Sequence, residues 1–165
     1  MGEYYVPILQ GKRLLRHKLQ LCAISALKVL CVYGMGSANS PGFRQIYVML
    51  PFLALVFFAG WGLISACSLF SWKDAMTKRQ YQASEKPLAQ GQRILPFMCA
   101  ALILAEVIFL LLGGAIQGEW LVLLMAFLLT GLSLSTCHVL ALGAPVKQAQ
   151  GKAPDTDVRL QAEDG

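Results

Sequence analysis

Residues 94–116 have the sequence ILPFMCAALILAEVIFLLLGGAI, and this stretch decides the fold class of the chain. It contains thirteen Leu, Ile, Phe and Val residues and one charged side chain, Glu106. A hydrocarbon core ~30 Å thick is crossed by about 20 mostly apolar helical residues. On insertion scales the apolar residues contribute roughly −4 to −8 kcal/mol, which offsets the cost of one carboxylate. The stretch therefore predicts a transmembrane helix.

Three further blocks of similar length and composition lie on either side of it. The four predicted spans are residues 19–37, 46–70, 94–116 and 120–142. Short outer turns join the first span to the second and the third to the fourth, and turn residues such as Pro41 and Gly42 mark the first of them. We therefore predict an all-α integral membrane protein, a four-transmembrane-helix bundle made of two hairpins.

The composition of the whole chain agrees with a membrane protein. Of its 165 residues, 56% are hydrophobic and 14% are charged, whereas soluble chains carry about 25% charged residues. The lipid bilayer is thus the first partner that the sequence predicts, and nucleic acid is not expected. The transmembrane domain covers residues 19–145, between a basic leader at 1–18 and a tail at 146–165 that we expect to be disordered.

The distribution of Lys and Arg predicts the orientation of the spans. The leader holds four of these residues, the linker at 71–93 holds five and the tail holds three, whereas the two other loops hold Arg44 alone. Cytoplasmic loops carry the excess of basic residues. We therefore expect the leader, the linker and both termini in the cytoplasm of a multi-pass protein of the cell (plasma) membrane, the bacterial inner membrane.

Lys28 and Glu106 are the charged residues deepest inside the predicted spans. A faint repeat at an offset of 77, which aligns Cys22 with Cys99, places Glu106 opposite Val29 and hence close to the level of Lys28. We therefore expect a Lys28–Glu106 ion pair near the membrane midplane. Such a pair either specifies helix packing, serves as a proton or ion relay, or joins this chain to another one.

The fourth span ends in an unusually polar stretch. Four of its side chains form a candidate cytoplasmic vestibule: Thr130, Ser133, Ser135 and His138. The alternative is that these residues only hydrogen-bond between packed helices. Small residues four apart, such as Gly131 and Ser135, allow helices to approach closely, either within the bundle or between chains.

The sequence gives little support for a metal or cofactor site, and we expect none. Five potential soft ligands lie near the predicted inner boundary: Cys22, Cys67, Cys99, Cys137 and His138. Their spacing matches no metal motif, and cysteines in apolar helices usually act as small hydrophobic fillers.

Catalysis is not expected either, because the outer loops contribute only Arg44 and Glu119 as charged side chains. A membrane hydrolase or transferase requires clustered acids, bases or a nucleophile. The prediction is a non-catalytic accessory, assembly or regulatory subunit of a membrane complex, with another membrane protein or a second copy as partner. The alternative is a small oligomeric transporter or channel that uses the Glu106 and Lys28 pair for ion or proton coupling.

Overall fold

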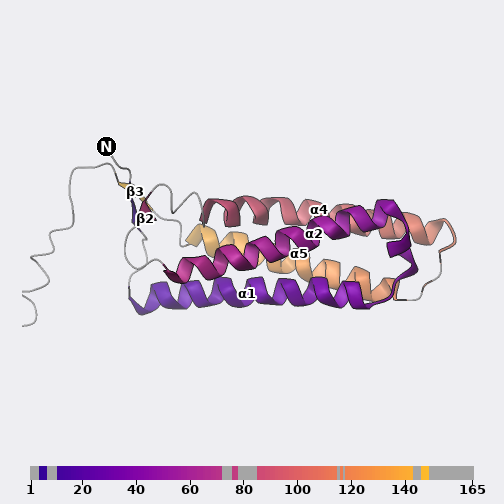
Figure 1. Ribbon diagram of the computed structural model, residues 1–165, viewed down its shortest axis with the longest axis horizontal. Helices are drawn as coiled ribbons and strands as arrows, with labels where there is room; N and C mark the ends of the chain where they lie inside the picture. Colours follow the sequence, from indigo (N-terminus) through magenta and orange to yellow (C-terminus); the bar gives the residue numbers. More distant parts are fainter. Residues whose placement is uncertain are drawn as a thin grey trace, which may run out of the picture.

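The computed structural model describes residues 4–6, 11–71, 76–77, 85–114, 116, 118–142 and 146–148. Four long helices lie side by side: α1 (Lys12–Ser37), α2 (Ile46–Ser68), α4 (Glu85–Leu111) and α5 (Glu119–Leu142) (Figure 1). Each contains a segment long and apolar enough to cross a membrane. The predicted all-α class and the bundle of four helices are confirmed.

Two helices match the predicted spans closely and two extend beyond them. α2 and α5 differ from the predicted limits by no more than two residues at either end. α1 begins at Lys12 rather than at residue 19, because the basic leader continues the helix. α4 begins at Glu85 and ends at Leu111, so Pro96 lies inside the helix and not in its first turn as expected.

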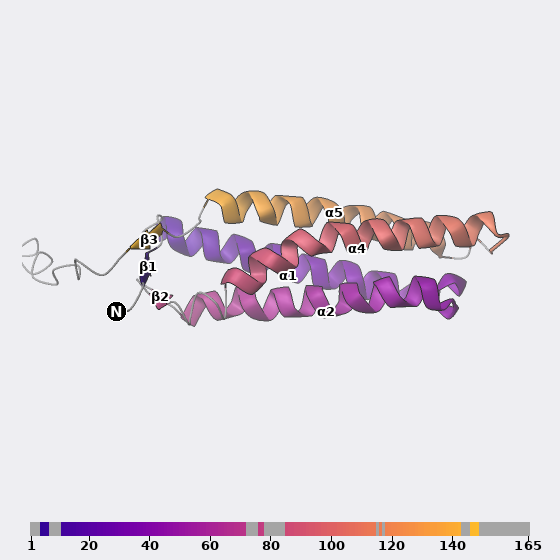
Figure 2. The ribbon, with the colours of Figure 1, turned by 90° about the horizontal axis from the view of Figure 1, so that it is seen from above.

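The four helices form a closed ring in which each one touches two neighbours. α1 packs against α2 and α5, and α4 packs against the same two helices from the opposite side. α1 therefore lies diagonally across the bundle from α4 (Figure 2). Only a long side chain can reach from one of these two helices to the other through the centre.

The interior of the ring is divided into two apolar clusters. The larger one includes Met35, Leu55, Leu102 and Leu129, and the smaller one includes Leu21 and four other residues near the end of the bundle at which α1 begins.

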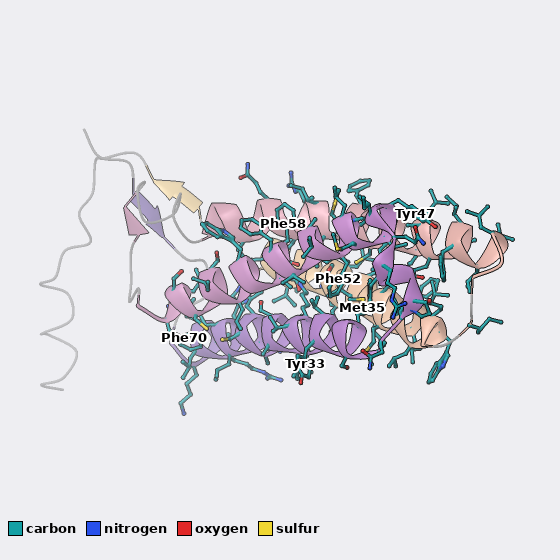
Figure 3. The ribbon with its side chains drawn as sticks, turned by 45° about the vertical axis from the view of Figure 1, so that its right-hand side comes forward. Tyr33, Met35, Tyr47, Phe52, Phe58 and Phe70 are labelled. Carbon is teal, nitrogen blue, oxygen red and sulfur yellow. The ribbon has the colours of Figure 1, made fainter. Side chains whose placement is uncertain are left out.

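The outer surface of the bundle is largely apolar. Only 28–33% of each candidate span is buried, and large side chains such as Phe97 and Leu111 are exposed. In Figure 3, Tyr33 points away from the helices, whereas Met35 lies between them. An apolar surface around all four helices indicates contact with the lipid of a bilayer, as expected of a multi-pass membrane protein.

A small antiparallel sheet lies beyond one end of the helices (Figure 1). Its central strand is β1 (Tyr4–Val6), flanked by β2 (Met76–Thr77) and β3 (Val146–Gln148). The sheet thus joins the leader, the central linker and the start of the tail. Residues 146–148 of the tail form strand β3, and residues 149–165, also expected to be disordered, lie outside the described residues.

Candidate functional site

The first candidate site is a buried polar cluster around Lys28, called here the lysine cluster. The Lys28 ammonium on α1 donates hydrogen bonds to the Gln92 side-chain amide oxygen and, at 2.6 Å, to the Thr136 hydroxyl. Lys28 is only 1% exposed, and both partners are buried. Because Gln92 lies on α4, diagonally opposite, the lysine crosses the centre of the ring.

The backbone of α4 and α2 is adapted to this cluster. Pro96 has no N–H and leaves the Gln92 carbonyl, four residues earlier, without its helical partner. The Cys137 thiol of α5 donates to that carbonyl, with 3.7 Å between sulfur and oxygen. On α2, a Cβ atom at Gly62 would lie 3.3 Å from the Gln92 amide nitrogen. Glycine therefore leaves the space that this amide occupies, and all four helices shape the cluster.

The Lys28 ammonium forms no ion pair with any carboxylate of the described residues, and its two partners are neutral oxygens. One turn earlier on α1, the buried Ser25 hydroxyl has no hydrogen-bond partner in the described part of the chain. Removing a charged group from water costs several kcal/mol even after the protein relaxes. The lysine cluster is therefore electrostatically uncompensated.

The second candidate site, called here the carboxyl cluster, lies at the end of the bundle where α1 ends and α5 begins. The Glu119 carboxylate, on the first residue of α5, accepts hydrogen bonds from the Ser40 hydroxyl and, at 3.1 Å, from the Gly42 backbone N–H. Both donors belong to the connection between α1 and α2, which includes the short 3₁₀ helix η1 (Pro41–Arg44). The positive end of the α5 dipole also favours a negative charge at Glu119.

Glu106 completes the carboxyl cluster from α4. It is 0% exposed, and neither carboxyl oxygen has a hydrogen-bond donor among the described residues. Its carboxyl group lies beside Gly42, whose backbone N–H donates to Glu119, so the two carboxyl groups are neighbours. A Cβ atom at Gly42 would lie 2.9 Å from the Glu106 Oε2 atom, so this glycine is the point where both carboxyl groups converge.

Gly118 fixes the position of Glu119. Its backbone has a φ of +84°, and a Cβ atom there would lie 2.4 Å from the Ala38 carbonyl oxygen. A left-handed conformation of this kind favours glycine. The residue before Glu119 is therefore held tightly against the end of α1.

The structure does not bring Lys28 and Glu106 together. Lys28 is bonded to Gln92, which precedes Glu106 by fourteen residues on α4, or ~21 Å along the helix axis. The expected depth was wrong for Glu106, because α4 begins and ends earlier than the predicted span. The expected depth was also wrong for the Lys28 ammonium. Helical side chains lean toward the helix N-terminus, and the long Lys28 side chain reaches Gln92 in that direction.

The four residues of the predicted vestibule do not share one cavity. Ser133 is buried and Thr130 is half-buried, whereas Ser135 and His138 are exposed on the outside of α5. The hydroxyls of Thr130, Ser133 and Ser135 donate to carbonyls four residues earlier in the same helix. Adjacent positions in a helix point in different directions, which explains the separation.

Sequence reasoning did not assign four polar residues of the two clusters to a site: Ser40, Gln92, Glu119 and Thr136. Gln92 and Glu119 were placed in the linker and the outer turn, because they border the apolar blocks. If the depth of Lys28 is counted to its ammonium group, which lies toward the N-terminus of α1 from its Cα atom, the predicted level is nearer to Gln92.

The cysteines are free thiols, and among the described residues no three His, Cys, Asp or Glu side chains lie close enough to hold a metal ion. Cys22 of α1 and Cys67 of α2 lie side by side, with 3.4 Å between their sulfur atoms.

Comparisons with protein-family models, with curated proteins and with solved structures found no match to this chain.

Proposed function

We propose that this chain is a non-catalytic accessory or assembly subunit of a membrane complex, and that α5 binds a transmembrane helix of the partner protein. The observation that carries the proposal is a small and polar face on the outside of α5. It consists of Gly131, Ser135 and His138, at spacings of four and three, and all three are exposed. This set is called here the α5 face.

The α5 face has the properties of a helix-packing surface that remains unoccupied in the monomer. Nothing lies within 4 Å of a Cβ atom built at Gly131. Small residues let two helix backbones approach closely, and Ser or His side chains hydrogen-bond across such contacts. Ionisable residues in transmembrane segments almost always face protein or water rather than lipid. A second helix on the α5 face would cover His138 and use the space at Gly131.

A comparison within the chain supports this reading of the α5 face. Gly62 and Ala66 on α2 show the same spacing of small residues, but both are buried in the bundle. That pair serves packing inside the monomer, whereas Gly131 and Ser135 are exposed on the outside of α5. The surface of α5 is therefore available for a partner.

The proposal includes the orientation in the cell membrane, taken as the bacterial inner membrane, with both termini cytoplasmic. The excess of Lys and Arg in the leader, the linker and the tail supports it. The sheet supports it as well, because β1, β2 and β3 bring those three segments together at one end of the helices.

Site-specific photocrosslinking in cells tests the proposal. A photoreactive amino acid at Ser135 should crosslink to one membrane protein of constant mass, whereas the same probe at Ile64, exposed on α2, should not. Gly131→Leu should abolish the Ser135 crosslink without lowering thermal stability. Equal crosslinking from both positions, or none from Ser135, would exclude α5 as the docking helix.

A second candidate function, a small oligomeric transporter or channel, is favoured by the unpartnered Glu106 carboxyl. The two clusters are separated by apolar residues such as Leu95, Leu102 and Ala126, so a pathway through one bundle is not formed and an oligomer would be required. Flux of protons or ions in proteoliposomes that Glu106→Gln abolishes would establish this function in place of the accessory role.

A further inference from the structure

The two carboxyl groups of the carboxyl cluster differ in the number of hydrogen bonds that they accept. Glu119 accepts bonds from the Ser40 hydroxyl and the Gly42 N–H and lies at the N-terminus of α5. Glu106 accepts none in the described part of the chain and is completely buried. A buried carboxylate without donors is costly, and a neighbouring carboxylate makes it costlier. A negative charge is therefore stabilised at Glu119 and not at Glu106.

We propose that Glu106 and Glu119 form a proton-binding site in which Glu106, as the carboxylic acid, donates its O–H to the Glu119 carboxylate. One proton removes one of the two charges and supplies the hydrogen bond that Glu106 otherwise lacks. The remaining charge stays on Glu119, where the Ser40 hydroxyl, the Gly42 N–H and the helix N-terminus already stabilise it. The proton thus gives one of the two unpartnered Glu106 oxygens a hydrogen bond, and the carbonyl oxygen of the acid needs no negative charge stabilised on it.

The surroundings favour a proton over a metal cation. Calcium requires six to eight oxygen ligands, whereas this site offers two carboxyl groups, and the Ser40 hydroxyl and Gly42 N–H already donate to one of them. No third acidic, histidine or cysteine side chain of the described residues joins the pair.

The other titratable groups at this end of the bundle do not balance the pair. Glu119 of α5 is the group whose carboxyl converges with that of Glu106 at Gly42. Tyr33 on α1, Arg44 on η1 and Tyr47 on α2 are all exposed. A bound proton is therefore the group that neutralises one of the two carboxylates.

The site connects the two hairpins. Ser40 and Gly42 belong to the α1–α2 connection, whereas Glu106 and Glu119 belong to the second hairpin. When the proton leaves, two adjacent buried carboxylates repel each other. While the proton is bound, the native state holds one proton more than the unfolded chain at neutral pH, so the free energy of unfolding decreases as pH rises.

Infrared spectroscopy of the full-length protein in lipid nanodiscs tests the proposal. The wild type should show the C=O absorption of a protonated carboxylic acid at neutral pH, and alkaline titration should remove it with one proton per chain. Glu106→Gln should abolish the band, and Glu119→Gln should shift its frequency. Glu85→Gln, a matched change at the start of the same helix, should leave the band unchanged.

Thermal unfolding of the same variants provides a second readout. The melting temperature of the wild type should fall as pH rises through the range in which the band disappears, and Glu106→Gln should remove this dependence. The proposal is overturned if the wild type lacks the band, if Glu106→Gln retains it, or if Glu119→Gln leaves its frequency unchanged. It is also overturned if sodium or calcium ions raise the melting temperature while the band is absent.

Carbodiimide labelling of the wild type keeps the proposal testable if a variant fails to fold. The reagent requires a protonated carboxyl group, so mass spectrometry should locate the adduct on Glu106 and labelling should decrease at alkaline pH. Absence of an adduct on Glu106 at every pH tested overturns the proposal.

Discussion

At the scale of single residues, the hydrogen bonds of Lys28 determine how substitutions in the lysine cluster change stability. Hydrogen bonds to charged groups contribute about 1.5–3 kcal/mol, and a buried charge that loses a partner is left uncompensated. Replacement of both members of a pair by apolar groups is often nearly neutral. The lysine and its amide partner should therefore behave as a coupled pair.

We expect Gln92→Leu to lower the free energy of unfolding by about 1.5–3 kcal/mol, because Lys28 keeps its charge and loses an acceptor. Lys28→Met should cost less, and the double variant should recover part of the loss. Unfolding in detergent measures these values.

The matched comparison is the cycle of Lys28→Met and Glu106→Gln. Glu106 lies ~21 Å along α4 from Gln92, the residue that Lys28 contacts, so the two changes should show additive effects. Strong coupling between Lys28→Met and Glu106→Gln would contradict the assigned contacts. Additive effects of Lys28→Met and Gln92→Leu would contradict them as well.

Gly118 provides a second prediction at this scale. Gly118→Ala combines a left-handed backbone with a contact of 2.4 Å to the Ala38 carbonyl oxygen, so we expect a loss of about 1–3 kcal/mol of stability. Gly60→Ala is the control, since nothing lies within 4 Å of a Cβ atom there. The control should be neutral or slightly stabilising, and equal melting temperatures for both variants would argue against the tight turn.

At the scale of helices, the thiol pair Cys22–Cys67 reports directly on the contact between α1 and α2. Because the sulfur atoms lie 3.4 Å apart, mild oxidation should form a disulfide within one chain and remove two alkylatable thiols. Mass spectrometry after alkylation measures the loss. Cys67→Ser should retain one thiol at Cys22, and a covalent dimer of the wild type would contradict the intramolecular contact.

The helices also show what the sequence could predict. Apolar blocks identified all four, and the limits of α2 and α5 were nearly correct, because lipid-facing and core positions are both apolar. The start of α4 was not predicted, because Glu85 and Gln92 are polar residues that continue the helix past the apolar block. Depth inside a helix was therefore uncertain by several residues, and the partner of Lys28 was misassigned.

At the scale of the whole molecule, the orientation in the membrane remains a prediction that surface labelling can check. Arg44 is exposed at the predicted outer end, and the outer loops contain no cysteine. A membrane-impermeant maleimide applied to intact cells should label Arg44→Cys and not the wild type. Labelling of the cysteine at position 44 only after the cells are permeabilised would indicate the inverted orientation.

The partners of Lys28 also lie far from it in sequence, by 64 residues for Gln92 and 108 for Thr136. At a synthesis rate of about 5–20 residues per second, the last helix follows the first by roughly 5–20 seconds. Gln92 follows Lys28 by roughly 3–13 seconds on the same scale, and until then the nascent first helix carries a lysine without either acceptor. A chain that stops after α2 lacks both acceptors, and its first helix should therefore be held in the membrane less stably than in the full-length protein.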